Sequence, residues 1–201
     1  MRKWPSNLQS LITEFGRLPG IGPKMAERIV LAMIKKPNSD VDAFVRALQT
    51  LTQGTNRCAT CYTLSAKDPC EICNDKTRDN SILLIVADPV SAFNIEKSQN
   101  FTGNYFILGG LINPIEGITP EKLRVKQLVS RISKDDSLKE VIFAFNQNVE
   151  GEATLLFLKK ILAETKDITL SRLARGVPMG ADLAYADDLT LASAVTERQK
   201  L

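Results

Sequence analysis

The sequence contains no histidine among its 201 residues. This absence removes the most common general base, every Ser–His or Cys–His nucleophilic pair, and every metal site with mixed cysteine and histidine ligands. No apolar run approaches the roughly 18 residues that a membrane-spanning helix requires, and residues 1–6 lack the apolar stretch and cleavage site of a signal peptide. We therefore expect a cytoplasmic protein with no membrane partner.

Excess positive charge is small and unevenly spread, with a net charge of only +3. Residues 1–80 hold 12 Lys and Arg against 8 Asp and Glu, a net charge of +4, whereas residues 81–201 hold 14 against 15, a net charge of −1. Positive charge in the N-terminal part favours a polyanionic partner there. A solvated surface with a chance asymmetry remains the alternative.

Residues 1–53 have the apolar spacing of a small helical unit. The pattern predicts a first helix that ends at Gly16, a second that begins after Gly22, and a third that follows residues 37–40. The predicted buried stripes are Met25, Ile29, Ala32 and Met33 in the second helix and Val41, Phe44, Val45 and Leu48 in the third.

The turn between the first two helices reads RLPGIGPK at residues 17–24. Its two glycines allow a tight turn and close approach of a partner, and amides at the start of the second helix can form an anion-binding concavity. Two cations lie one turn apart on one side of that helix. These features suit contacts with DNA phosphates, although a plain helical hairpin with a glycine-rich turn is the alternative. The candidate DNA-binding residues are Arg17, Gly20, Gly22, Lys24 and Arg28.

All four cysteines fall within one short window, as two Cys-x-x-Cys pairs separated by eight residues: Cys58, Cys61, Cys70 and Cys73. Each pair can aim two thiolates at one point, and the two pairs complete a tetrahedron around Zn²⁺. Four sulfur ligands leave no open coordination position, so the zinc would be structural, and its binding energy of about 10–16 kcal/mol could hold a polar segment folded. Disulfides conflict with a cytoplasmic location, and a thioredoxin-type redox pair would explain only one of the two motifs.

The hydrophobic pattern of the sequence changes near residue 80. Short apolar runs occur at 82–86, 105–108, 141–145 and 168–170, and helical stretches lie near 90–98, 120–132 and 151–165. Continuous apolar runs are typical of strands buried on both faces. Their alternation with helices predicts a parallel sheet covered on both faces.

In this order, the motifs resemble the RecR family of bacterial recombination mediators, and the hairpin looks like the helix-hairpin-helix of DNA repair proteins. Further similar segments are FTGNY at 101–105, ILGG at 107–110, NPIEGI at 113–118, VEGEAT at 149–154, RLARGVPMG at 172–180 and DLAYADDLTL at 182–191. The resemblance implies an α/β multidomain protein. Its expected parts are an N-terminal helix-hairpin-helix DNA-binding domain (1–53), a four-cysteine zinc finger (54–79), a Toprim parallel α/β domain (80–176) and a C-terminal Walker-B-like helical tail with an oligomerisation role (177–201).

The same resemblance implies a DNA-binding mediator of recombinational DNA repair, associated with the nucleoid. It would act with RecO and RecF to help load recombinase on gapped or single-stranded DNA, as a homodimer that builds up to a tetrameric ring. Glu150 and Glu152 would face a protein partner, although the helix macrodipole alone favours carboxylates in the first turn of a helix.

In catalytic Toprim proteins such as topoisomerases and primases, a glutamate after the first strand and an Asp-x-Asp after a later strand hold Mg²⁺. Here Ala87 and Asp88 follow the first strand, and residues 146–148 read Asn-Gln-Asn. We therefore expect no enzymatic activity. A Mg²⁺-dependent nuclease or primase-like enzyme is the alternative.

Overall fold

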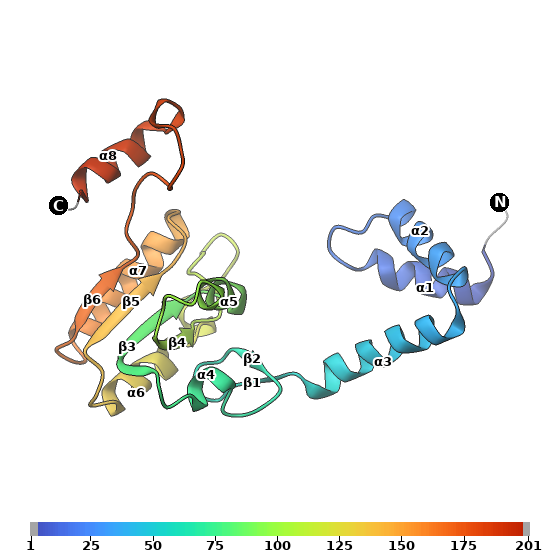
Figure 1. The fold of residues 1–201 in the computed structure, drawn as a ribbon, viewed down its shortest axis with the longest axis horizontal. Helices are drawn as coiled ribbons and strands as arrows, with labels where there is room; N and C mark the ends of the chain where they lie inside the picture. Colours follow the sequence, from blue (N-terminus) through green and yellow to red (C-terminus); the bar gives the residue numbers. More distant parts are fainter. Residues whose placement is uncertain (1–3, 199–201) are drawn as a thin grey trace. The chain divides into compact units, whose positions relative to one another are not determined.

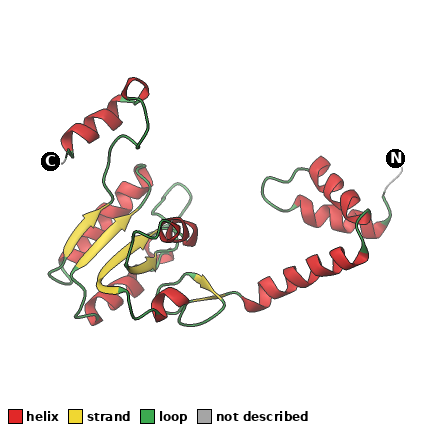
Figure 2. Ribbon diagram, viewed as in Figure 1, coloured by secondary structure: helices red, strands yellow, loops and turns green. Residues whose placement is uncertain are grey.

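The computed structural model describes residues 4–198, apart from the side chains of Thr52 and Gln53. Residues 1–3 and 199–201, which belong to the first and last predicted domains, lie outside the described residues. The chain divides into two compact units, Met1–Thr55 and Asn56–Leu201. Figure 2 shows helices alone in the first unit, whereas all the strands lie in the second. No helix among the described residues has the length and apolarity needed to cross a bilayer.

The helical unit consists of α1 (Ser6–Gly16), α2 (Pro23–Ile34) and α3 (Asn38–Gly54) (Figure 1). In α2, Ala26 and Val30 are fully buried, whereas 48% of Met25 is exposed. The predicted stripe of α2 is therefore wrong at Met25 and at Ala32, which is also exposed, whereas Ile29 and Met33 are half-buried. Apolar residues occupy both the predicted and the observed face of this helix, so their spacing alone does not select the buried one.

The apolar stripe of α3 is exposed in this chain. The exposed fractions of Phe44, Val45 and Leu48 are 41%, 44% and 50%, and only Val41 is half-buried. The helix and its stripe lie where the sequence predicts them, but the predicted burial of the stripe is wrong for a single chain. An exposed row of apolar side chains is typical of interaction surfaces.

The second unit is built on a four-stranded sheet. Its strands are β3 (Asp79–Val86), β4 (Gly103–Ile107), β5 (Glu140–Ala144) and β6 (Thr169–Arg172), in the order β4-β3-β5-β6. All three pairings are parallel, with Leu84 opposite both Tyr105 and Ile142. The parallel sheet predicted from the apolar runs is confirmed. Because the chain crosses over β3 to form β5, the carboxyl ends of these two strands meet at a switch point, where ligands of such sheets usually bind.

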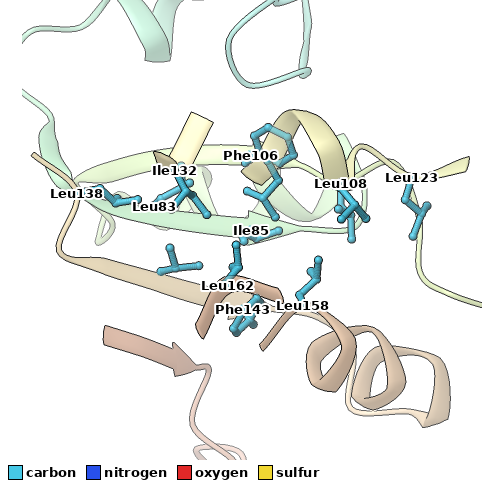
Figure 3. Close-up of a cluster of buried hydrophobic side chains, with 13 residues drawn as sticks. Leu83, Ile85, Phe106, Leu108, Leu123, Ile132, Leu138, Phe143, Leu158 and Leu162 are labelled. Atoms are coloured by element: carbon cyan, nitrogen blue, oxygen red, sulfur yellow. The ribbon is translucent and has the colours of Figure 1, made fainter. Parts of the chain in front are cut away.

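Helices cover both faces of this sheet. Alternate residues of a strand point to opposite sides, so a continuous apolar strand such as β3 has apolar side chains on both faces that must be covered. The helices are α5 (Pro89–Lys97), α6 (Val125–Lys134), preceded by the 3-10 turn η1 (Pro120–Lys122), and α7 (Val149–Ala163). On one face, Leu128 and Ile132 of α6 and Leu158 and Leu162 of α7 join the core around Ile85 and Phe143 (Figure 3). On the other face, Ala92 of α5 packs with Leu84, Val86, Tyr105 and Ile107.

Two smaller segments flank the sheet domain in the chain. The cysteine segment forms an antiparallel pair, β1 (Asn56–Arg57) and β2 (Leu64–Ser65), followed by α4 (Glu71–Asn74). The tail after β6 forms the 3-10 turn η2 (Leu183–Tyr185) and α8 (Asp188–Thr196), which begins at Asp187 as a side-chain cap.

Candidate functional sites

The four cysteines converge on one point. Their sulfur atoms all lie within 4.8 Å of one another, and Cys61 Sγ is 3.6 Å from Cys70 Sγ. A tetrahedral zinc with Zn–S bonds of about 2.3 Å sets its sulfur atoms about 3.8 Å apart, so the cluster has the size of a zinc site. Cys58, Cys61 and Cys70 are at most 3% exposed. Burial of thiols at this spacing fits four ligands of one structural metal ion.

Hydrogen bonds from backbone amides and between thiols stabilise negative charge on the sulfur atoms of this cluster, as binding of a cation requires. The Cys70 amide donates to Cys58 Sγ and the Cys73 amide to Cys70 Sγ, each at 3.4 Å. A hydrogen bond from the Cys73 thiol is the main cause that lowers the pKa of Cys61 to about 5, and the same bond raises the pKa of Cys73. Without a metal the cluster therefore favours one thiolate. A divalent cation would let all four sulfurs ionise, because its charge offsets their repulsion.

The cysteine segment is docked on the edge strand β4. The Ile107 amide donates to the Cys61 carbonyl at 2.8 Å, so the finger continues the hydrogen bonding of the strand. Arg131 of α6 donates to the carbonyls of Thr60 and Tyr105 at 3.2 and 2.9 Å. Tyr62 packs edge-on against Phe106, with 5.4 Å between ring centroids. The finger thus covers part of a sheet edge that would otherwise expose unpaired backbone groups.

The turn of the hairpin depends on Gly20. The Ile21 amide donates to the Leu18 carbonyl at 3.1 Å, and Gly20 has a φ of +78°. Proline followed by glycine with positive φ at the two central positions is the pattern of a type II turn. Gly22 has a φ of −79° and no atom near the position of a β-carbon. It therefore leaves space for a partner and is not required by the backbone conformation.

The hairpin has backbone amides and cationic side chains on its surface that are not paired with groups of the chain that the structure describes. Among the described residues, the amides of Gly20, Gly22 and Lys24 have no hydrogen-bond acceptor. Lys24 and Arg28 are exposed, and neither has a described carboxylate within 4 Å. Arg17 differs, because it pairs with Glu14 at 2.7 Å on the surface. The hairpin therefore presents two unpaired cations beside three free amides.

The segments that directly follow β3 and β5 at the carboxyl edge of the sheet, residues 87–88 and 146–148, contain one carboxylate, that of Asp88. Ala87 follows β3, and the carboxylate of Asp88 caps α5 by accepting from the Ser91 amide at 2.9 Å. Asn148 caps α7 in the same way, accepting from the Gly151 amide at 2.9 Å. Over residues 4–198, the four cysteines are the only group of three or more His, Cys, Asp or Glu side chains close enough to hold a metal ion.

The two candidate partner residues lie in the first turn of α7 but differ in their contacts. Glu152 forms ion pairs with Arg175 and, at 3.5 Å, with Arg172. Arg172 also pairs at 2.9 Å with Glu197, which follows α8 in the tail. Glu150 is half-buried and has no ion pair in the part of the chain that the structure describes. Only Glu150 therefore keeps a carboxylate that no neighbouring cation neutralises.

Comparisons with known proteins match each of these regions. The RecR helix-hairpin-helix family matches residues 8–52, the RecR four-cysteine zinc finger domain residues 55–75, the Toprim domain residues 81–174, and the RecR C-terminal family residues 176–199. Recombination protein RecR of Thermosynechococcus vestitus is 44% identical over 194 residues, which cover 96% of this chain and 95% of that protein. Recombination protein RecR of Moorella thermoacetica is 43% identical over 198 residues, which cover 98% of each. The chain belongs to the RecR family.

Membership of the RecR family gives the chain a role in recombination and DNA repair. The predicted order of helix-hairpin-helix, zinc finger and Toprim domain is confirmed. The match to the four-cysteine zinc finger domain and the thiol cluster together confirm one structural zinc per chain. The boundaries after residues 53, 79 and 176 stay predictions.

Sequence reasoning missed the side chains that join the parts of this RecR chain. Arg131 ties the finger to the sheet, and Arg172 and Arg175 tie the tail to α7. The carboxylate partners of Arg172 and Arg175 lie up to 25 residues away in sequence, so spacing could not reveal them.

Proposed function

We propose that this protein is a DNA-binding recombination mediator whose helix-hairpin-helix is a DNA contact. The observation that carries the proposal is the pair of unpaired cations, Lys24 and Arg28, beside the free amides that follow the Gly20 turn. Such a surface binds backbone phosphates and does not read sequence. Arg17 would contribute less than Lys24 and Arg28, because Glu14 already pairs with its charge. Binding of this kind would associate the protein with the nucleoid.

The mediator would work as an assembly of identical chains, from a dimer to a tetrameric ring. The exposed stripe of Phe44, Val45 and Leu48 on α3 supports a contact with a second copy, because burying it against an equivalent surface removes apolar area from water. A second exposed set lies in the tail, where Leu189 is 82% exposed and Tyr185 is 90% exposed. Two separate apolar surfaces suit a ring, in which each chain meets two neighbours.

The protein partners we propose are RecO and RecF, with which the assembly would help load recombinase on gapped or single-stranded DNA. Glu150 and Glu152 at the start of α7 are the proposed partner-facing residues. Glu150 is the stronger candidate because its carboxylate has no ion pair among the described residues, whereas Glu152 already has two arginine partners.

The Toprim domain would act in this mediator as a binding scaffold and not as an enzyme. The support is chemical: Ala87, Asn146, Gln147 and Asn148 offer no carboxylate where catalytic relatives hold Mg²⁺. Hard divalent cations prefer carboxylate oxygens, and the nearby Asp88 already caps a helix. No observation favours the Mg²⁺-dependent nuclease or primase over this role.

The hairpin is tested by the double variant Lys24→Ala with Arg28→Ala. We expect affinity for duplex DNA to fall about 60-fold at 0.1 M salt, and the slope of log K against log salt to become shallower by about 1.8, because two phosphate contacts are lost. Fluorescence anisotropy with a labelled duplex across salt measures both quantities.

The matched control changes Lys35→Ala with Lys36→Ala, which removes the same charge from the other end of α2. Equal affinities and slopes for the two double variants would show that the hairpin is not the DNA contact.

A further inference from the structure

A second basic surface lies in the α/β unit, between the finger and α6. It is a groove of about 480 Å³, far in sequence from the hairpin. We name it the α6 groove and define it by six residues that line it: Thr60, Tyr62, Lys126, Ser130, Arg131 and Lys134. No acidic residue is among those that line it.

The cations of the α6 groove form a row. Lys126, Ser130 and Lys134 follow one another at four-residue spacing, so they share one face of α6 over about 12 Å. Lys126 and Lys134 are exposed. Arg131 donates hydrogen bonds to two backbone carbonyls, which carry no net charge and so do not neutralise its guanidinium. None of these three cations has a carboxylate within 4 Å over residues 4–198.

Further positive charge lies beside the groove. The guanidinium of Arg124 lies over the Tyr62 ring at 5.0 Å. Burial lowers the pKa of Arg124, and the charge of Arg57 lowers it further.

Two carboxylates lie near this row of cations. Lys126 contributes to lowering the pKa of Glu121, after the hydrogen bonds from Thr119 and from its own amide. Asp68 accepts a hydrogen bond at 2.9 Å from the amide of Ala59, which lines the groove. The five cations outnumber these two carboxylates.

The composition of the groove indicates which polyanion it fits. Acidic peptide motifs are recognised by clusters of arginines, whereas Arg131 is the one arginine that lines the groove, and it already donates to two backbone carbonyls. The β4 edge already pairs with the finger at Ile107, and Phe106, at the base of the groove, is fully buried. A cationic track with an accessible aromatic ring is the combination found in grooves that bind single-stranded nucleic acid. Tyr62, half-buried beside the lysine row, is such a ring.

We propose that the α6 groove binds the phosphodiester backbone of a single DNA strand, as a contact separate from the hairpin. The proposal rests on the DNA-binding function proposed above but not on the hairpin as its site. Lys126 and Lys134 contact phosphates, Arg131 adds charge while it holds the finger in place, and Tyr62 offers a face to a base. A mediator that acts where duplex and single strand meet thereby has a surface for each.

The proposal is tested by the double variant Lys126→Ala with Lys134→Ala. Release of counterions from a single strand contributes roughly fivefold in affinity for each phosphate contact at 0.1 M salt. The variant therefore loses about 25-fold in affinity for an oligothymidylate strand, and its salt slope becomes shallower by about 1.4. Anisotropy titrations with the oligothymidylate and with a duplex of equal length, from about 0.05 to 0.2 M salt, give these values.

The matched control is Lys159→Ala with Lys160→Ala, which removes two exposed lysines from α7 outside the groove. Zinc content and the circular dichroism spectrum of both variants show that the fold is kept. A loss confined to the groove variant and to the single strand supports the proposal. Equal behaviour of the groove and control variants overturns it. Unchanged DNA binding with lost binding of a polyglutamate peptide also overturns it and assigns the groove to an acidic protein segment.

The Lys24/Arg28 variant separates this inference from the hairpin function. If the hairpin variant loses duplex binding and keeps single-strand binding, while the groove variant loses the single strand, both proposals stand. If the hairpin variant binds duplex normally while the groove variant loses the single strand, the hairpin assignment fails and the groove stands. If the groove variant binds the single strand normally while the hairpin variant loses duplex binding, the groove proposal alone fails.

Discussion

The two units of the chain reach stability in different ways. In the α/β unit, two clusters of buried side chains fill both faces of the sheet, and Leu158, Leu162 and Ile132 are fully buried (Figure 3). In the described part of the helical unit, Ala26 and Val30 are the only apolar side chains with that degree of burial. A domain of about fifty residues buries a smaller fraction of its surface than a larger one. The helical unit therefore has less buried apolar surface of its own than the α/β unit.

The zinc finger is an intermediate case. Its buried cluster consists of cysteines, with Ile72 packed against it. A metal replaces the apolar core there, and the gain in folding comes from ligand bonds. The three regions thus differ in how they are held together: a packed apolar core in the sheet domain, a metal site in the finger, and little buried apolar surface in the described part of the helical unit.

The largest expected effect follows from removing the metal ligands. Cys61→Ser should unfold the finger locally, since zinc contributes on the order of 10 kcal/mol to the folding of such a segment. Amide hydrogen exchange should lose protection over residues 56–74 and at Ile107, whose amide donates to Cys61, while α7 keeps its protection. Thr60→Ser, an exposed neighbour, is the control. Retained protection at Ile107 in a zinc-free Cys61→Ser protein would contradict a metal-dependent finger.

A smaller effect is expected on the unfolding transitions of the two units, which can be measured separately. The single tryptophan, Trp4, lies in the helical unit, and all three tyrosines lie in the α/β unit, so two optical signals report the two transitions separately. If a second copy covers α3, the denaturation midpoint of the tryptophan signal rises with protein concentration, because the free energy of unfolding increases by about 2.7 kcal/mol at a hundredfold excess over the dissociation constant. Leu48→Asp should abolish this rise and lower the mass measured by light scattering.

Leu158→Ala is the counterpart of that variant in the α/β unit. A buried leucine truncated to alanine costs about 2–5 kcal/mol. The cost should appear in the tyrosine transition and be independent of protein concentration. A tryptophan midpoint that ignores concentration in the wild-type protein would show that the helical unit is stable without a second copy.

Prediction from sequence worked where a short-range pattern determines the structure. Four apolar runs predicted the four strands, and the spacing of the cysteines predicted their convergence. The turn at Gly20 follows from a proline and a glycine next to each other. The buried face of α2 was wrong at Met25, because a helix that is apolar on two sides does not reveal which side packs. The ion pairs of Arg172 and the hydrogen bonds of Arg131 could not be predicted, since their partners come from distant segments.

The smallest expected effect concerns the contact between the tail and α7. The pKa of Glu197 is lowered, first by the hydrogen bond that its carboxylate accepts from the Arg175 amide and then by Arg172. Its contribution is therefore fully present above the unfolded pKa of about 4.3 and is lost as the pH falls through the lower folded value.

Glu197→Gln should accordingly increase the exchange of α8 amides by roughly two- to fivefold at neutral pH, the range of an exposed ion pair. The increase should vanish at a pH below the folded pKa, where the wild-type carboxyl is also neutral. Glu164→Gln, an exposed glutamate at the end of α7, is the control. If Glu197→Gln leaves exchange of α8 unchanged at neutral pH, the apolar side chains of the tail, and not its ion pairs, hold it in place, and the helical unit and the tail then depend on the same kind of contact.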